Sequence, residues 1–180
     1  MNPSPGITLQ YSLTLTALTH TTPQFSPKTL ARAWLALYQL GPRWVPPLIL
    51  PGALANLVLA YQQHHSLQQE EQKRNLYLLA AALTFSILPV TFLYFEPGIN
   101  GACKWKVEGL LTREEAGLSE GKGKGLVGTS VVRHSGGERA KRWAERSGMA
   151  ELVEDWVWRN QGRWVVGLVA GVVSFAALVG

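Results

Sequence analysis

Long apolar stretches alternate with charged segments along the whole chain. Residues 44–61, 76–95 and 164–180 contain no charged side chain. Each is close to the ~20 residues with which a helix crosses ~30 Å of hydrocarbon, and ~17 residues is the lower limit. Aromatic side chains lie at the ends of these stretches, as in the interfacial belt of membrane spans: Trp44, Tyr61, Tyr77, Tyr94, Phe95 and Trp164. The pattern predicts an all-α, multi-pass integral membrane bundle with three strong spans, not a soluble protein with buried helices.

A fourth, N-terminal segment is weaker. Residues 6–18 are apolar but short, and they include Gln10, Ser12 and three threonines. Small and hydroxyl side chains allow helices to approach closely inside a membrane. The segment is therefore either a weak first span or an embedded half-helix, and the sequence leaves both open.

Two amphipathic stretches precede spans. Ser26 and Pro27 suit the N-cap and the first position of a helix, and Trp34 and Tyr38 then fall on one face of it. Residues 149–162 repeat this arrangement before the last span. We expect both to be interfacial helices that lie flat and anchor the chain.

The basic residues predict the orientation. Of 17 lysines and arginines, 12 lie between residues 96 and 163, and the stretch 20–43 holds three more. Both segments fall on one side of the predicted bundle, and the positive-inside rule makes that side cytosolic. The net charge of +5 suits an anionic membrane surface, and we expect the lipid bilayer, not nucleic acid, as the partner. The endoplasmic reticulum is the candidate compartment.

The chain reads as a single domain over residues 1–180 with a glycine-rich insert. Residues 112–148 have the composition of a flexible segment. Residues 123–128, GKGLVG, match the dinucleotide pattern G-x-G-x-x-G, but no apolar strand precedes them, as that motif requires. Cys103 is the only cysteine, so no intrachain disulfide forms. We therefore expect neither a metal nor a motif-borne cofactor.

The most distinctive stretch is FEPGINGACKWK, residues 95–106, which follows an apolar span containing Pro89. Together with WLALYQLGPRWVPPL at 34–48 and WVWRNQGRWVVGLVAG at 156–171, it resembles the anthrone oxygenase-like family of small multi-span membrane proteins. Many members of that family have no known function, and members usually have four spans.

The resemblance implies a chemistry that needs no cofactor. Characterised members oxidise anthrones to anthraquinones in polyketide pathways of secondary metabolism, with dioxygen as the oxidant. Losing a methylene proton turns an anthrone into an electron-rich aromatic anion that can pass an electron to dioxygen. The protein must supply an apolar pocket, a base and donors for the developing oxyanion. The resemblance implies Glu96 as the base and Asn100, Lys104 and Arg163 as donors to the oxygen. It implies Phe95, Trp105 and Trp164 as the residues that contact the substrate rings.

Each of these residues also has a purely structural interpretation. Glu96 can simply end a helix before a Pro-Gly turn, Lys104 and Lys106 can extend to lipid phosphates, and Trp105 can belong to the aromatic belt. The alternative function is a non-catalytic membrane scaffold that holds pathway enzymes. The two hypotheses differ in whether a small hydrophobic aromatic substrate is turned over.

Overall fold

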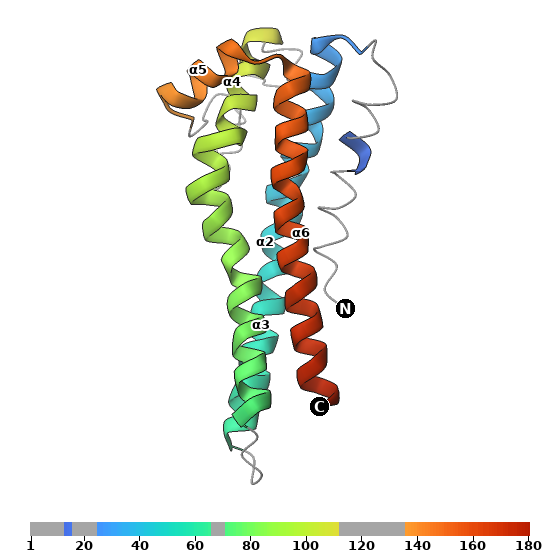
Figure 1. Cartoon of the computed structure of the whole chain (residues 1–180), viewed down its shortest axis with the longest axis vertical. Coiled ribbons are helices and arrows are strands. Elements are labelled where there is room, and N and C mark those ends of the chain that lie inside the picture. Colours follow the sequence, from blue (N-terminus) through green and yellow to red (C-terminus); the bar gives the residue numbers. More distant parts are fainter. Residues whose placement is uncertain (1–12, 16–24, 66–70, 112–135) are drawn as a thin grey trace.

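The computed structural model describes residues 13–15, 25–65, 71–111 and 136–180. Nearly all of these residues are helical, and they contain no strand. The elements are α2 (Pro27–His65), α3 (Glu71–Val90), the π-helix η1 (Thr91–Asn100), α4 (Gly101–Leu110), α5 (Glu138–Arg146) and α6 (Met149–Val179). The all-α prediction is confirmed for the described chain (Figure 1).

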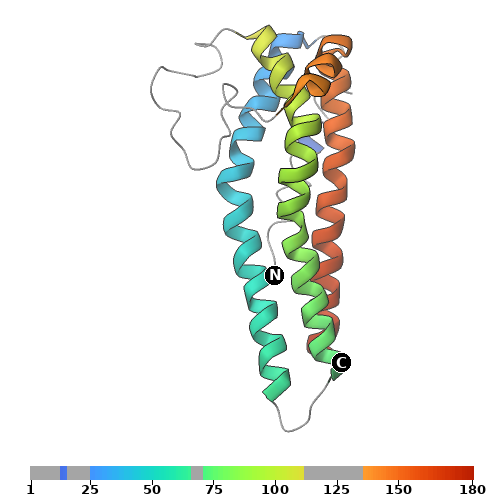
Figure 2. The ribbon, with the colours of Figure 1, turned by 90° about the vertical axis from the view of Figure 1, so that its left-hand side faces the viewer.

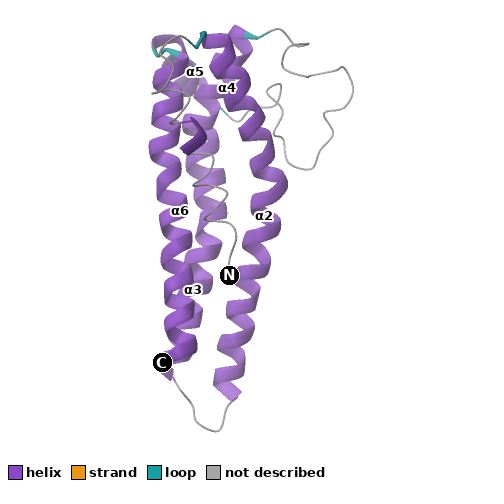
Figure 3. Ribbon diagram, turned by 90° about the vertical axis from the view of Figure 1, so that its right-hand side faces the viewer, coloured by secondary structure: helices purple, strands orange, loops and turns teal. Residues whose placement is uncertain are grey.

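Three long helical rods form the bundle. The first is α2, the second joins α3, η1 and α4, and the third is α6; each is long and apolar enough to cross a membrane. They run along the same axis in views from opposite sides, with α5 at one end (Figures 2 and 3). At 1.5 Å per residue, the 39 residues of α2 extend roughly 60 Å, about twice the hydrocarbon thickness. The protein is thus an integral membrane protein whose helices continue well beyond the bilayer core.

The stretches before the first and last spans are not separate helices. α2 begins at Pro27, and the Ser26 hydroxyl accepts a hydrogen bond from the Thr29 amide at 3.2 Å, which confirms the predicted N-cap. The helix then continues without interruption to His65, and α6 likewise runs unbroken from Met149 to Val179. The prediction of two flat interfacial helices was wrong, because their apolar faces pack on protein: Trp34 and Trp156 are buried in one core.

The second rod changes geometry just beyond Pro89. Pro89 lies inside α3, where a kink was expected because proline has no amide hydrogen for the Phe85 carbonyl. The chain becomes π-helical from Thr91, and Gly98 has non-helical backbone angles (φ −93°, ψ −109°). Widened turns of this kind often occur at functional sites, and this one contains Glu96.

The two ends of the bundle are packed differently. Towards the end that holds the 66–70 connection, small residues such as Ala80, Ala170 and Ala177 are buried between helices, as is usual in membranes. Ser174 donates a 2.8 Å hydrogen bond to Asn56 across α6 and α2. Large apolar side chains face outward there, where lipid covers them. The opposite end holds a dense core contributed by α2, η1, α4, α5 and α6.

Helix α5 closes the dense end and corrects the expected flexible insert. Residues 138–146 are helical, and Ala140 and Ala144 are buried in the core. Gly136 lies directly on Gly101, since a Cβ on Gly101 would come within 2.5 Å of the Gly136 Cα. The predicted insert therefore contains a packed helix from residue 138, and its remainder before residue 136, including the 123–128 motif, lies outside the described residues.

The first turns of α2 lie at the same end as α4 and α5 (Figure 1), as the orientation argument requires. Most of the weak segment 6–18 falls outside the described residues. Residues 13–15 are helical, and Leu15 is fully buried in the dense core.

Candidate functional site

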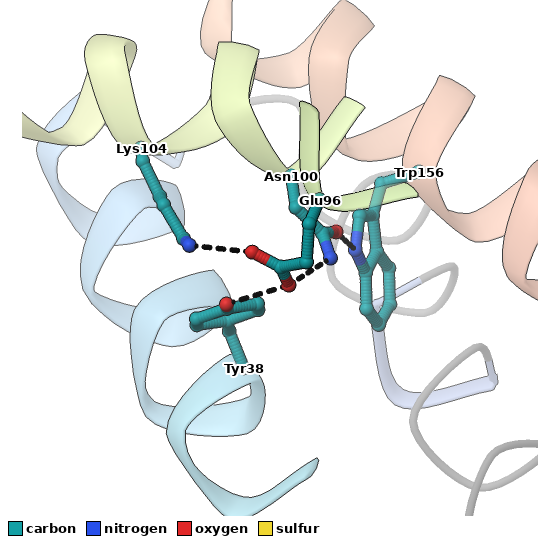
Figure 4. Close-up of polar contacts among 5 residues, drawn as sticks. All are labelled: Tyr38, Glu96, Asn100, Lys104 and Trp156. Atoms are coloured by element: carbon teal, nitrogen blue, oxygen red, sulfur yellow. Dashed lines mark hydrogen bonds and ion pairs between the residues drawn. The ribbon is translucent and has the colours of Figure 1, made fainter. Parts of the chain in front are cut away.

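A single carboxylate, Glu96, gathers hydrogen-bond donors inside the dense end of the bundle (Figure 4). Its Oε1 accepts hydrogen bonds from the Tyr38 hydroxyl at 2.7 Å and from the Asn100 amide at 2.8 Å. Its Oε2 accepts a hydrogen bond from the Lys104 ammonium at 2.7 Å. The Lys104 side chain is fully buried and that of Glu96 is 14% exposed. Three donors, one of which is the Lys104 cation, hold the carboxylate in place.

Helical spacing explains why Glu96 meets Asn100 and Lys104. Glu96, Asn100 and Lys104 are four residues apart, which places side chains on one face of a helix. They remain on one face although the backbone passes from η1 into α4 between them. The other contacts come from distant segments, since Tyr38 belongs to α2 and Trp156 to α6. The Trp156 indole donates a 2.8 Å hydrogen bond to the Asn100 carbonyl oxygen.

Aromatic rings enclose the carboxylate cluster. The rings of Trp34 and Tyr38 stack with centroids 4.9 Å apart, and Trp156 meets Trp34 edge-on at 6.4 Å. The Lys104 ammonium lies 4.8 Å from the centroid of the Tyr38 ring. The Trp34 indole nitrogen is buried without a hydrogen-bond partner among the described residues. The rings exclude water, so the interactions of Glu96 are stronger than they would be at a surface.

Arg163 lies on α6 beside this cluster and is held by three contacts. It donates hydrogen bonds to the Asn160 amide oxygen through Nε and Nη2, and to the Thr91 hydroxyl through Nη1 at 3.2 Å. Its guanidinium lies 4.8 Å from the centre of the Phe95 ring. An arginine has five N–H donors, so two remain without a partner among the described residues.

A pocket of about 320 Å³ opens between the second rod and α6. Its wall is aliphatic and aromatic, with Phe95 and Tyr94 from η1, and Arg159 and Arg163 supply cationic groups. Ligand pockets occupy roughly 300–1,000 Å³ and combine apolar walls with a few polar groups. This pocket is therefore suited to a small, largely apolar molecule that carries a hydrogen-bond acceptor for the arginines.

Most of the predicted site residues lie together, with two exceptions. Glu96, Asn100 and Lys104 share one cluster, and Phe95 and Arg163 share the adjacent pocket. Trp105 faces α5 instead, where its indole donates to the Gly136 carbonyl at 2.9 Å and Lys141 lies over its ring. Trp164 has a buried indole nitrogen without a partner among the described residues, and it does not line the pocket.

Lys106 also has a different position from the expected one. Instead of extending to lipid phosphates, its ammonium donates to the Ala144 carbonyl in the last turn of α5 at 3.0 Å. Cations stabilise this end of a helix dipole.

Sequence reasoning missed four residues as site components, namely Tyr38, Trp156, Thr91 and Asn160. The first two were visible only as members of apolar faces, and their contacts with Asn100 and Glu96 join segments 56 and 58 residues apart. The described residues contain no group of histidine, cysteine, aspartate and glutamate side chains that could hold a metal ion.

The chain matches a known protein family. Residues 34–173 match the family described as Anthrone oxygenase. The chain belongs to the anthrone oxygenase family. The matched range contains every residue of the carboxylate cluster and of the adjacent pocket. No curated protein and no solved structure matches the chain.

Proposed function

We propose that this protein is a cofactor-independent oxygenase that oxidises an anthrone-type polyketide intermediate to the corresponding anthraquinone. Membership of the anthrone oxygenase family supports the reaction type. The observation that carries the proposal is the apolar pocket with Arg163 at its wall, directly beside the buried Glu96 cluster. A bilayer around the bundle concentrates such a hydrophobic substrate.

Arg163 acts as the oxyanion donor in this proposal. Deprotonation of an anthrone moves negative charge onto the carbonyl oxygen on the opposite edge of the central ring. Arg163 is fixed by Asn160 and Thr91 and retains N–H groups for a ligand. A preorganised donor of this kind stabilises the anion more than the neutral ketone, and it therefore makes the methylene easier to deprotonate.

Glu96 acts as the base. It follows Phe95, whose ring lines the pocket, and it is ionised before substrate arrives. Asn100 and Lys104 were expected to donate to the substrate oxygen, but both donate to Glu96. We assign them, with Tyr38, as positioning residues that fix the carboxylate and balance its charge.

The reaction balances as anthrone plus dioxygen giving anthraquinone plus water. The base removes one methylene proton, and the anion passes one electron to dioxygen. The resulting carbon radical and superoxide combine to form the C–O bond of a peroxide. The base returns the first proton to the terminal oxygen of the peroxide. Loss of the second methylene hydrogen as a proton then breaks the O–O bond and leaves the new carbonyl, and the departing hydroxide takes up that proton as water.

The second candidate function is a membrane scaffold for pathway enzymes. One observation favours it: the Glu96 cluster ties α2, α4 and α6 together through bonds that would also suit a purely structural role. The two functions differ in turnover, because a scaffold leaves the substrate unchanged.

An oxygen-consumption assay tests the proposal. The full chain is purified into lipid nanodiscs and supplied with an anthrone in air, with no flavin, nicotinamide or metal added. Anthraquinone should form with one dioxygen consumed per product, and formation should stop under nitrogen. Nanodiscs without the protein measure the spontaneous oxidation, and an equal rate in the two samples would favour the scaffold.

A further inference from the structure

A second, larger pocket lies between α5 and η1, away from the carboxylate cluster, and it shares Tyr94 and Arg159 with the first pocket. Its volume is about 790 Å³. Arg139 and Arg146 of α5 and Arg159 of α6 line it. The rest of its wall includes Leu93 and Tyr94 of η1 and Trp143 of α5. Among the residues that the structure describes, no acidic side chain lines it.

The three arginines carry uncompensated charge. Among the described residues none of them forms an ion pair with a carboxylate. Arg159 donates to the Tyr94 hydroxyl at 2.6 Å, and its guanidinium lies over the rings of Tyr94 and Trp143 at 5.9 and 5.4 Å. Its Nε is buried with no hydrogen-bond partner in the described part of the chain. Arg139 and Arg146 are exposed and Arg159 is half-buried, so it is the unpaired Nε and the grouping of three cations, not a buried charge, that favour an anionic ligand.

The outer surface of the protein beside the pocket is apolar. Leu93, which lines the pocket, is 79% exposed, and Trp158, beside Arg159, is 73% exposed. Large exposed apolar side chains on a membrane protein face acyl chains, and tryptophan and tyrosine mark the headgroup level. The basic pocket therefore opens at the depth where lipid headgroups lie, with an apolar surface continuing from it.

Charged side chains of α5 line two different pockets. Arg139 and Arg146 face the pocket at η1, whereas Lys141 and Glu145 line a separate pocket against α4. Two of the four basic residues of α5 thus line this cavity, and the other two, Lys141 and Arg142, lie outside it.

We propose that this pocket binds the phosphate-bearing headgroup of an anionic phospholipid. Arg139, Arg146 and Arg159 contact the phosphate, and the acyl chains follow the apolar surface at Leu93 and Trp158. Basic pockets beside membrane helices bind anionic headgroups in this way. A free phosphate would satisfy the arginines but would leave that apolar surface uncovered.

Native mass spectrometry of the full-length protein in detergent tests the proposal. The probes are phosphatidylserine, phosphatidylcholine and inorganic phosphate, each titrated against the wild-type protein. The double variant Arg139→Gln/Arg146→Gln removes two pocket charges, and Lys141→Gln/Arg142→Gln removes two charges from the same helix outside the pocket. Each pocket arginine lost should weaken phosphatidylserine binding roughly fivefold, or on the order of 30-fold for the pair.

The expected result is tight retention of phosphatidylserine over phosphatidylcholine, lost in the pocket variant and kept in the control. Equal weakening in both double variants would overturn the proposal, because it would mean diffuse attraction. Equal retention of phosphatidylcholine, or displacement of the lipid by inorganic phosphate at equal concentration, would also overturn it. If the pocket variant does not fold, Arg146→Gln compared with Arg142→Gln gives the same test.

Discussion

At the scale of single residues, the buried pair of Glu96 and Lys104 dominates the site. A buried ion pair contributes little net stability, but removing one partner leaves the other charge uncompensated. Here the ammonium is fully buried and makes its 2.7 Å contact with Glu96 under the Tyr38 ring. The folded site therefore depends on both charges being present.

Lys104→Met should lower the free energy of unfolding by about 3–5 kcal/mol, because Glu96 would then be buried without a cation. Denaturant unfolding in detergent micelles measures this change. Lys28→Met is the control, since Lys28 is exposed and surface substitutions usually stay within about 0.5 kcal/mol. Adding Glu96→Gln to Lys104→Met should recover part of the loss. A Lys104 variant as stable as the Lys28 variant would contradict the pairing.

Arg163→Met should reduce the turnover number for anthrone oxidation by about 10²–10³, the usual effect of losing one oxyanion donor. The reason is that Arg163 combines a guanidinium fixed by Asn160 and Thr91 with a place over the Phe95 ring at the pocket wall. Arg142→Met, on the exposed side of α5, serves as the control and should keep wild-type turnover. Equal turnover in both variants would remove Arg163 from the mechanism.

The sequence pointed to part of this site for a local reason. Glu96, Asn100 and Lys104 repeat every four residues, so a helix brings them together whatever the rest of the chain does. Tyr38 and Trp156 join them through tertiary packing of separate helices. No spacing within the sequence encodes such contacts, and both residues therefore read only as parts of apolar faces.

At the scale of elements, the contact between α5 and the start of α4 decides how the dense end is closed. Gly101 and Gly136 touch through their backbones, which allows the Trp105 indole to reach the Gly136 carbonyl. Lys106 adds a bond to the last turn of α5. This helix was hidden in the sequence because it follows a glycine-rich stretch and is strongly charged, so composition suggested a flexible segment.

Gly101→Ala should detach α5, because the new methyl would lie 2.5 Å from the Gly136 Cα and backbone cannot easily give way. Hydrogen exchange of residues 138–146 should accelerate, and the thermal unfolding midpoint should fall. Gly109→Ala in the same helix is the matched control, since nothing lies within 4 Å of its added methyl. It should stabilise α4 by up to about 1 kcal/mol. Unchanged exchange in Gly101→Ala would show that the contact is not needed.

The sequence predicted where the membrane spans lie but not how far the helices that contain them extend. The charge-free runs 44–61 and 76–95 lie within the long rods, and so does 164–180 except for Gly180. Their continuation through the amphipathic stretches could not be predicted, because an amphipathic face is equally suited to lipid and to a protein core. The buried positions of Trp34 and Trp156 decide for the protein core.

At the scale of the whole molecule, one end of the bundle exposes apolar side chains and the other holds the candidate site. The lipid-facing end buries small residues and exposes large apolar ones, while the dense end holds the cluster, the pocket and α5. A substrate dissolved in the bilayer would therefore reach the pocket from the membrane side.

Single-cysteine labelling should place the two ends on opposite sides of the membrane. Cys103 is fully buried and is expected to stay unlabelled. Arg142→Cys on α5 should react with an impermeant maleimide from the cytosolic side of sealed vesicles, and His64→Cys at the far end of α2 only from the other side. Labelling of both from the same side would contradict a spanning bundle, and reversed accessibility would contradict the orientation.

The most direct test of the account is the turnover number of Glu96→Gln in nanodiscs, measured beside the wild type with an anthrone and dioxygen. Glutamine keeps the size of the side chain and removes the base, so thermal unfolding of the same sample must first show a folded bundle. The account predicts a turnover number lower by about 10²–10⁴, the usual contribution of a positioned general base. A folded Glu96→Gln protein that turns over at the wild-type rate would contradict the claim that this buried carboxylate takes the proton.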